Sequence, residues 1–216
     1  MPTKIGKGNK GWQKSEKKPK ERMKDKQCII GVDQSYTRTG VSIAIKGELV
    51  KVTSINLTKI KTKTMKRRAA TDFVEKAVKA CLRKYEPDNI AIICERVRTF
   101  TSGEDLRPNV IKPFAAMTCC FVDMAFDYGV EVWSVDTRAW KNAILGTTKL
   151  IFEPIEGVSN IQKFGSVRRV IDLGFYDSLV REGRHGAHYT LDDDAADSAC
   201  IALYGFTKDR KLQKEL

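Results

Sequence analysis

The chain has 216 residues, 42% of them hydrophobic, and its 39 Lys and Arg against 27 Asp and Glu give a net charge of +12. This length accommodates one domain with extensions and a sizeable core, and the lack of an apolar run of about 18 residues argues against a membrane span. The positive charge favours a polyanionic partner, first of all nucleic acid, although many basic tails only improve solubility.

Residues 1–27 hold ten Lys or Arg and three Asp or Glu, with few apolar residues. This segment is therefore predicted to be a disordered basic tail, and it has no apolar core of a secretory signal. The six cysteines lie mostly within apolar runs and form no C-x-x-C motif. We expect reduced, buried thiols in an intracellular protein rather than a zinc site.

Three strands are predicted first, over residues 28–33, 41–45 and 49–55. The first segment is a continuous apolar run, and the next two alternate between apolar and polar residues, with turn residues between the segments. This pattern is typical of an antiparallel meander. Asp33 ends the first strand on what should be its inner side. An aspartate after a strand is often only a turn former, and that alternative stays open.

A basic link with lysines and arginines between residues 59 and 68 leads to a predicted helix over 69–85. An apolar strand over 89–95 follows and again ends on an acid, Glu95. Residues 96–109 are predicted to form a polar loop with Phe100 at its tip. A helix over 110–128 and a strand over 130–135 come next, and Asp136 is expected to cap a short helix. Loops over 147–160 and 174–190 flank a helix over 161–173.

The chain closes on an acidic helix over 191–204, which carries aspartates at 192, 193, 194 and 197 before a run of core residues. On a helix, Asp194 and Asp197 lie at i,i+3 and Asp193 and Asp197 at i,i+4, so their like charges repel. N-capping and the helix dipole account for Asp192 or Asp193. They account poorly for Asp197, whereas a divalent metal ion would explain it, because hard cations prefer carboxylate oxygens.

This order of elements predicts an α/β fold with a mixed five-stranded sheet, three strands antiparallel and the others parallel, and helices on both faces. The predicted domain spans residues 28–207, between the basic tail at 1–27 and a short C-terminal tail at 208–216. Acids then end the first and fourth strands and begin the last helix.

The motifs that carry these acids resemble the ribonuclease-H-like nucleases, and specifically the RuvC-type Holliday junction resolvases. They are IIGVDQSYTRTG around Asp33, IICE ending at Glu95, and DAADSA beginning at Asp194 and including Asp197. The resemblance covers roughly residues 28–206. It implies that these four acids bind two Mg²⁺ ions, which Mn²⁺ can replace, and that a homodimer makes paired nicks in a four-way DNA junction, without a small-molecule cofactor.

The resemblance also implies two lysines near the site, and by position Lys141 and Lys163 correspond to them. Lys163 is predicted to be catalytic and Lys141 to contact DNA; the alternative is that both are ordinary surface lysines. Further DNA contacts are predicted for Arg98, Phe100, Arg168 and Arg169. The basic tail and the longer loops depart from the cellular enzymes, which suggests a viral or phage relative.

Phosphodiester hydrolysis needs an activated water, a stabilised leaving oxygen and neutralisation of charge at the phosphorus. Two divalent ions about 3.5–4 Å apart can supply all three, and several converging carboxylates can hold them. Lys163 would then stabilise transition-state charge or position the scissile phosphate. Asp193 is either a cap or an auxiliary ligand, and His185 and His188 are given no role.

Other functions compete with this one. A broader nuclease for flaps and forks cannot be separated from a strict resolvase by sequence, and the RNA strand of a hybrid stays possible because fold does not set substrate. A nuclease-inactive junction-binding protein is disfavoured by the four intact acids. The GVD segment also resembles the first phosphate loop of actin-like ATPases, but no second phosphate loop or adenosine site follows.

Overall fold

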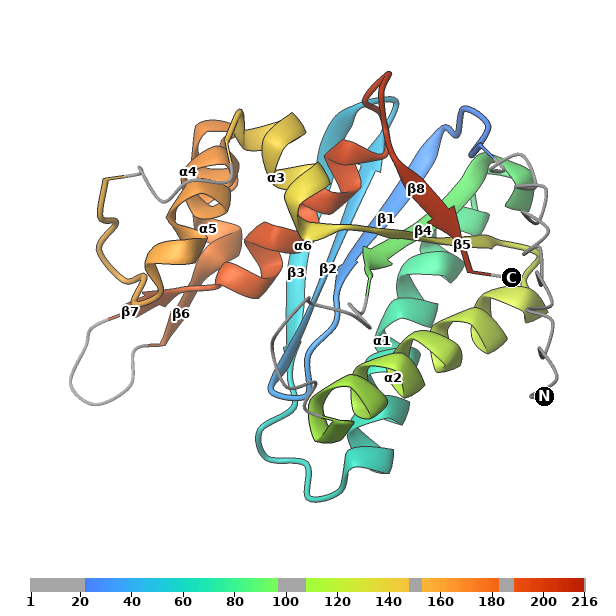
Figure 1. The fold of residues 1–216 in the computed structure, drawn as a ribbon, viewed down its shortest axis with the longest axis horizontal. Helices are drawn as coiled ribbons and strands as arrows, with labels where there is room; N and C mark the ends of the chain where they lie inside the picture. Colours follow the sequence, from blue (N-terminus) through green and yellow to red (C-terminus); the bar gives the residue numbers. More distant parts are fainter. Residues whose placement is uncertain (1–21, 97–107, 148–152, 183–188, 216) are drawn as a thin grey trace, which may run out of the picture.

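A twisted sheet of six strands forms the centre of the chain in a computed structural model that describes residues 22–96, 108–147, 153–182 and 189–215 (Figure 1). Its strand order is β3-β2-β1-β4-β5-β8. The strands are β1 (Cys28–Asp33), β2 (Arg38–Ile45), β3 (Glu48–Asn56), β4 (Ile90–Glu95), β5 (Glu131–Val135) and β8 (Leu212–Lys214). A separate two-stranded ribbon consists of β6 (Val180–Glu182) and β7 (Tyr189–Leu191).

The pairing confirms the predicted mixed sheet. Strands β1, β2 and β3 pair antiparallel in sequence order, and β4 then pairs parallel to β1 with β5 parallel to β4. Because Val32 is the register partner of Cys94, the next residues, Asp33 and Glu95, end neighbouring parallel strands at the same edge. The parallel register of β1 and β4 therefore places these two acids side by side.

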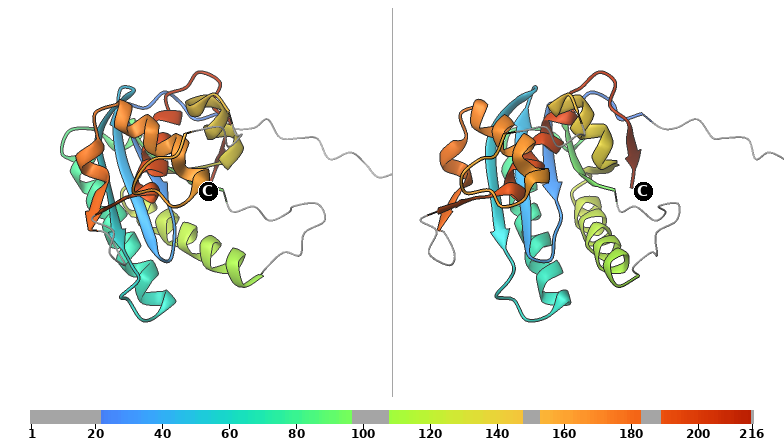
Figure 2. Two further views of the ribbon diagram at one scale, coloured as in Figure 1. Left: turned by 90° about the vertical axis from the view of Figure 1, so that its left-hand side faces the viewer. Right: turned by 60° about the vertical axis from the view of Figure 1, so that its left-hand side comes forward.

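The helices lie on both faces of the sheet (Figure 2). One face is covered by α1 (Lys63–Leu82) and α2 (Pro108–Asp127), whose Val78 and Phe121 share a core with Ile30 and Val32 of β1. The other face carries α6 (Asp193–Tyr204), with α3 (Thr137–Leu145) and α4 (Phe164–Asp172) packed against it. Short turns of helix complete the described structure: η1 (Pro87–Asn89), η2 (Ile161–Lys163) and α5 (Tyr176–Leu179).

Two glycines let α6 lie directly on the backbone of β1 and β2. A Cβ atom at Gly31 would be 2.1 Å from the carbonyl oxygen of Ser198, and one at Gly40 would be 2.0 Å from the carbonyl oxygen of Asp194. Ser42 of β2 adds a hydrogen bond of 2.7 Å between its hydroxyl and that of Ser198. Because any side chain larger than hydrogen would clash, these glycines fix how closely the acidic helix approaches the sheet.

Several elements differ from those predicted. The sheet has a sixth strand, because β8 lies within the predicted C-terminal tail and pairs antiparallel with β5. Helix α1 begins at Lys63 rather than at residue 69, since the Thr62 side chain accepts the Met65 N–H and caps it. The loop predicted over 174–190 holds α5, β6 and β7. Residues 1–21 lie outside the described part of the chain.

The last residues of the predicted basic tail pack on the domain. Met23 is buried in the core beside Trp133 and Tyr204, and its carbonyl accepts a hydrogen bond from Arg210. Lys26 pairs with Glu131 at 2.8 Å. Among the described residues, no helix is both long and apolar enough to cross a membrane.

We expect Gly31→Ala to destabilise the chain more than Gly205→Ala. The new methyl group at Gly31 would lie 2.1 Å from the backbone oxygen of Ser198 in α6, whereas at position 205 it would meet side-chain atoms of Ile93 and Ile29 at 2.8–3.0 Å. Overpacking against side chains costs about 1–3 kcal/mol, and we expect Gly31→Ala to exceed that range. Urea unfolding of the two variants measures the difference, and equal destabilisation would contradict the proposed backbone contact.

Candidate active site

The first part of the site is the edge of the sheet where β1 and β4 end. Asp33 follows the fully apolar end of β1 and is 8% exposed. The side chain of its neighbour, Gln34, joins the two strand ends: it donates to the Glu95 carbonyl at 2.6 Å and accepts the Glu95 N–H at 3.2 Å. These two hydrogen bonds extend the β1–β4 pairing by one residue and hold Asp33 and Glu95 at the same edge.

The second part is the first turn of α6, which Asp192 caps. One Asp192 carboxylate oxygen accepts the Ala195 N–H, and the other accepts from Arg38 at 3.0 Å and from Arg181 at 3.2 Å. Ser54 donates to the same oxygen. The predicted capping role of Asp192 is therefore confirmed, and its buried charge is compensated by two guanidinium groups.

Lys163 brings the two parts together. It lies at the end of η2, directly before α4, and its ammonium nitrogen is 3.4 Å from an Asp33 oxygen and 3.8 Å from an Asp194 oxygen. It also donates to Asp197, the shortest of its contacts. Three of the four predicted acids, from β1 and from α6, thus converge on one partly buried cation.

Glu95 completes the cluster and is held by an aromatic neighbour. The indole N–H of Trp140, a fully buried residue of α3, donates to the Glu95 carboxylate at 2.7 Å. The pKa of Glu95 is raised by burial and by the charge of Asp197, while the hydrogen bond from Trp140 and the charge of Lys163 lower it. Glu95 therefore lies within the electrostatic reach of the acids on α6 and of Lys163.

Burial dominates the ionisation of the acids. It raises the pKa of Asp33 well above 3.8, against the attraction of Lys163 and with further repulsion from the other three acids. It raises the pKa of Asp194 to about 7, again opposed by Lys163. For Lys163, burial lowers the pKa, but Asp33 and Asp197 outweigh it, so the ammonium stays protonated. One lysine thus leaves the negative charge of the cluster incompletely balanced.

The residues present fit a divalent metal ion. Asp197 is 3% exposed, and its second carboxylate oxygen is buried without a hydrogen-bond partner. An unpaired buried carboxylate oxygen is costly, and a hard cation is the ligand that such oxygens prefer. Oxygens of Asp192, Asp193 and Asp194 also lie within 4.8 Å of one another. However, Asp192 is already engaged by Arg38, Arg181 and Ser54, which leaves it unsuited to a metal ion.

The structure places the other predicted residues as follows. Lys141 of α3 donates to the Gln162 carbonyl at 3.3 Å, next to Lys163, and its ammonium lies 5.4 Å from the centre of the Trp140 ring. Arg168 and Arg169 are exposed on α4. Four further residues named above lie outside the described part of the chain: Arg98, Phe100, His185 and His188.

Several residues that shape the site were not predicted. Gln34 and Trp140 position Glu95, and Arg38 with Ser54 compensates the Asp192 carboxylate. Gln34 directly follows Asp33 and could have been suspected from that position. The partners of Asp192 and Glu95 are distant in sequence, and no local pattern connects them.

The raised pKa of Asp194 predicts how stability depends on pH in the absence of metal. Since the pKa of about 7 exceeds the ordinary 3.8, the folded chain holds a proton that the unfolded chain releases between these values. This contribution to stability is therefore full below pH 3.8 and is lost as the pH rises through 7. We expect Asp194→Asn to gain stability relative to wild type over this interval.

Urea unfolding in the presence of a chelator, at several pH values from about 4 to 8, measures this difference. Asp172→Asn, at an exposed aspartate that ends α4, is the matched control and should track the wild type. A constant difference between Asp194→Asn and wild type at all these pH values would refute the assignment.

Comparisons with known proteins agree with this architecture. No family model matches the chain, and no curated protein matches it in sequence. The solved structure "Thermus thermophilus RuvC structure" is similar, with 15% identity and a TM-score of 0.52. "T. thermophilus RuvC in complex with Holliday junction substrate" has 13% identity and a TM-score of 0.54. Each covers 87% of this chain and 99% of its own. The chain therefore has a RuvC-type fold of the ribonuclease-H-like class.

Proposed function

We propose that the chain is a metal-dependent endonuclease that cuts four-way DNA junctions. The observation that carries this proposal is the convergence of Asp33, Asp194 and Asp197 on Lys163, with Glu95 beside them. This buried, incompletely balanced cluster sits in a fold whose solved neighbours include a RuvC bound to a Holliday junction substrate. The net charge of +12 also suits a DNA substrate.

Asp33, Glu95, Asp194 and Asp197 would hold two Mg²⁺ ions, or Mn²⁺ in their place. Bound there, the ions would supply Lewis-acid activation of water and neutralisation of phosphate charge. The protein's own residues would set the geometry: Gln34 and Trp140 hold Glu95, and the capped start of α6 holds the two aspartates. Their rigid attachment is what a preorganised site requires.

Lys163 would contribute a fixed positive charge. Its ammonium is held between carboxylates of two elements, and the surrounding acids keep it protonated. A scissile phosphate at the cluster would be attracted to this donor, which offsets the repulsion from the acids. Lys141, whose side chain lies beside the same segment, would contact the DNA backbone, as would Arg168 and Arg169 on α4.

We further propose that the chain acts as a homodimer, because paired nicks on two strands of one junction require two sites. The DNA contacts proposed for Arg98 and Phe100 belong to this same hypothesis. A broader activity on flaps and forks is the alternative, since the same cluster could cut any branched DNA that reaches it.

Cleavage of a labelled mobile four-way junction tests the proposal directly. With Mg²⁺ we expect paired nicks on opposing strands, lost on chelation and restored by Mn²⁺. Asp33→Asn and Asp197→Asn should each lose cleavage by about a hundredfold or more while still binding the junction, because they remove metal ligands and leave the rest of the site. The matched control is Asp172→Asn, which changes the charge equally at an exposed position.

Three results would change the conclusion. Equal cutting of flaps and forks would demote the chain to a general branched-DNA nuclease, and a cut restricted to the RNA strand of a hybrid would change the substrate. Tight junction binding with no cutting in Mg²⁺ or Mn²⁺ would refute the enzyme hypothesis in favour of a junction-binding protein.

Lys163→Met tests the role assigned to the lysine. We expect cleavage to fall by about 10²–10³-fold at saturating junction, because a transition-state donor is lost rather than a substrate contact. Lys141→Met is the comparison: we expect it to weaken junction binding and to leave the rate at saturation nearly unchanged. The reverse pattern in single-turnover rates would contradict the two roles.

Deleting residues 1–21 tests whether the basic segment contacts DNA. The deletion removes seven lysines but keeps Met23 in the core. We expect weaker junction binding and a slope of log affinity against log salt concentration that is shallower by up to about 6, since each phosphate contact contributes about 0.9. An unchanged slope would show that the segment contacts no phosphate.

A further inference from the structure

A strongly positive surface spans the turn between β3 and α1 and the first two turns of α1, and the proposed chemistry does not use it. No acid lies between Glu48 and Asp72, and among the described residues no carboxylate pairs with a cation of this segment. Its charge is therefore unbalanced, and a polyanion would relieve the repulsion between the like charges. This α1 patch consists of six residues: Lys59, Lys61, Lys63, Lys66, Arg67 and Arg68.

The backbone that carries the α1 patch is held in place by the domain. Leu57, two residues before the patch, is fully buried, and Ile60 packs against the core between the first two lysines. The Thr62 side chain accepts the Met65 N–H at 3.2 Å and caps α1. Because this backbone is already ordered, a ligand would have to order only side chains, which lowers the entropic cost of binding. Four of the six cations are exposed: Lys59, Lys61, Lys63 and Arg68.

The α1 patch lies at the same end of the sheet as the acidic cluster. Because β2 runs antiparallel to both β1 and β3, these two strands end at the same edge (Figure 1). The Leu57 N–H, just past β3, donates to the Thr37 carbonyl at 2.8 Å, four residues after Asp33. Neighbouring strands lie about 4.8 Å apart, so the end of β3 is about 10 Å from the end of β1. The patch therefore begins within the length of a few base pairs from the acids.

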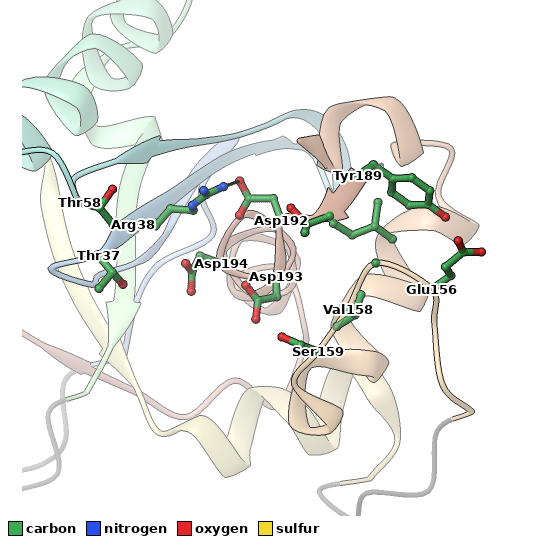
Figure 3. A pocket seen from close by; sticks show the side chains of 13 residues that line it. Thr37, Arg38, Thr58, Glu156, Val158, Ser159, Tyr189, Asp192, Asp193 and Asp194 are labelled. Atoms are coloured by element: carbon green, nitrogen blue, oxygen red, sulfur yellow. Dashed lines mark hydrogen bonds and ion pairs between the residues drawn. The ribbon is translucent and has the colours of Figure 1, made fainter. Parts of the chain in front are cut away.

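Open space connects the acidic cluster to the patch. One cavity of about 740 Å³ is lined by Asp194 of the cluster and also by Thr37 and Thr58, the residue directly before Lys59. Figure 3 shows Thr37 and Thr58 together on one side of this space, with the Asp194 carboxylate beside it. A DNA strand with one phosphate at the cluster can therefore continue across this space toward the patch.

The patch and the other cations proposed to contact DNA lie on opposite faces of the sheet. Helix α1 packs with α2 on one face, whereas Lys141 of α3 and Arg168 and Arg169 of α4 belong to the face that carries α6 (Figure 2). The acids that end β1 and β4 lie at the edge between these faces. DNA that passes the cluster would therefore meet cations on both sides of it.

We propose that the α1 patch binds the phosphate backbone of the duplex arm next to the cut strand, as a second DNA-contact surface opposite that of α3 and α4. This inference rests on the proposed function. Duplex DNA carries one charge per about 1.7 Å of its axis, and the helical part of the patch alone is about 9 Å long, so it can neutralise several phosphates. Because phosphate contacts carry no sequence information, the patch holds the arm without selecting its bases.

A triple variant, Lys61→Gln with Lys63→Gln and Arg68→Gln, tests the patch at three exposed positions. Junction affinity is measured against salt concentration in the Asp33→Asn chain, so that cutting does not interfere. We expect weaker binding and a slope of log affinity against log salt that is shallower by about 2–3, since each phosphate contact contributes about 0.9. In the chain with Asp33 intact, the cutting rate at saturating junction should stay near the wild-type value, because no residue of the cluster changes.

The matched control removes three exposed cations farther along the same segment, with Lys76→Gln, Arg83→Gln and Lys84→Gln. The end of α1 lies at the opposite end of the sheet, because Cys81 contacts Cys28 at the start of β1. The control changes the net charge by the same amount, so an effect of total charge alone would appear in both variants. We expect its salt slope to stay within about one of the wild-type value.

Hydroxyl-radical footprinting of the bound junction locates the contact without any cutting. We expect the backbone of one duplex arm to be protected, beginning about three to six base pairs from the junction centre, and this protection should disappear in the patch variant but not in the control. Loss of that protection, with no cleavage by the wild type in Mg²⁺ or Mn²⁺, would support the patch and refute the nuclease. Equal slopes and footprints in both variants, with normal cleavage, would overturn the patch and leave the nuclease standing.

Discussion

The close contact between α6 and the backbone of β1 and β2 is the constraint on which the site depends. Gly31 and Gly40 leave no Cβ atom between helix and sheet, and the Ser42–Ser198 hydrogen bond joins the two surfaces. A helix packed on ordinary side chains would lie farther away. At the observed approach, the first turn of α6 reaches the edge where β1 ends, so acids that are distant in the sequence share one volume.

Because these acids lie close together, their negative charges repel one another, and the fold compensates only part of this charge. Four carboxylates are gathered under low exposure, and their repulsion and loss of hydration oppose ionisation. The structure separates the acids into two groups. Asp192 is neutralised by two arginines and serves the helix, whereas the cluster around Lys163 keeps an unpaired oxygen on Asp197. If the cluster around Lys163 were purely structural, we would expect its carboxylates to be paired as fully as that of Asp192.

The elements that carry the acids could be predicted because each has a strong local signal. Apolar strands that end in Asp33 and Glu95, and an apolar helix that begins with aspartates, are visible in the sequence. Strand β8 could not be predicted, because three residues with alternating exposure gain their structure only from pairing with β5. The start of α1 was missed because its first turns are basic and look like a link, although Thr62 caps them.

The sequence predicts which acids form the site, but it does not predict which residues contact them. The acids converge on Lys163 because of where η2 lies in the fold. The residues directly before η2, over 153–160, form no helix or strand, so no local pattern predicts that position. Arg38 contacts Asp192, 154 positions away in the sequence, and Trp140 contacts Glu95, 45 positions away. Only the folded chain shows these pairs.

The anchoring of Met23 has a consequence for how the basic segment before it can act. Gln27 donates to Asn89 just before β1 and β4 begin, so the segment joins the domain at the end of the sheet opposite Asp33. A six-residue strand spans about 20 Å, and this length separates the anchor from the acids. In the proposed nuclease, the lysines before Met23 are thus attached to the domain about one strand length away from the site of cutting.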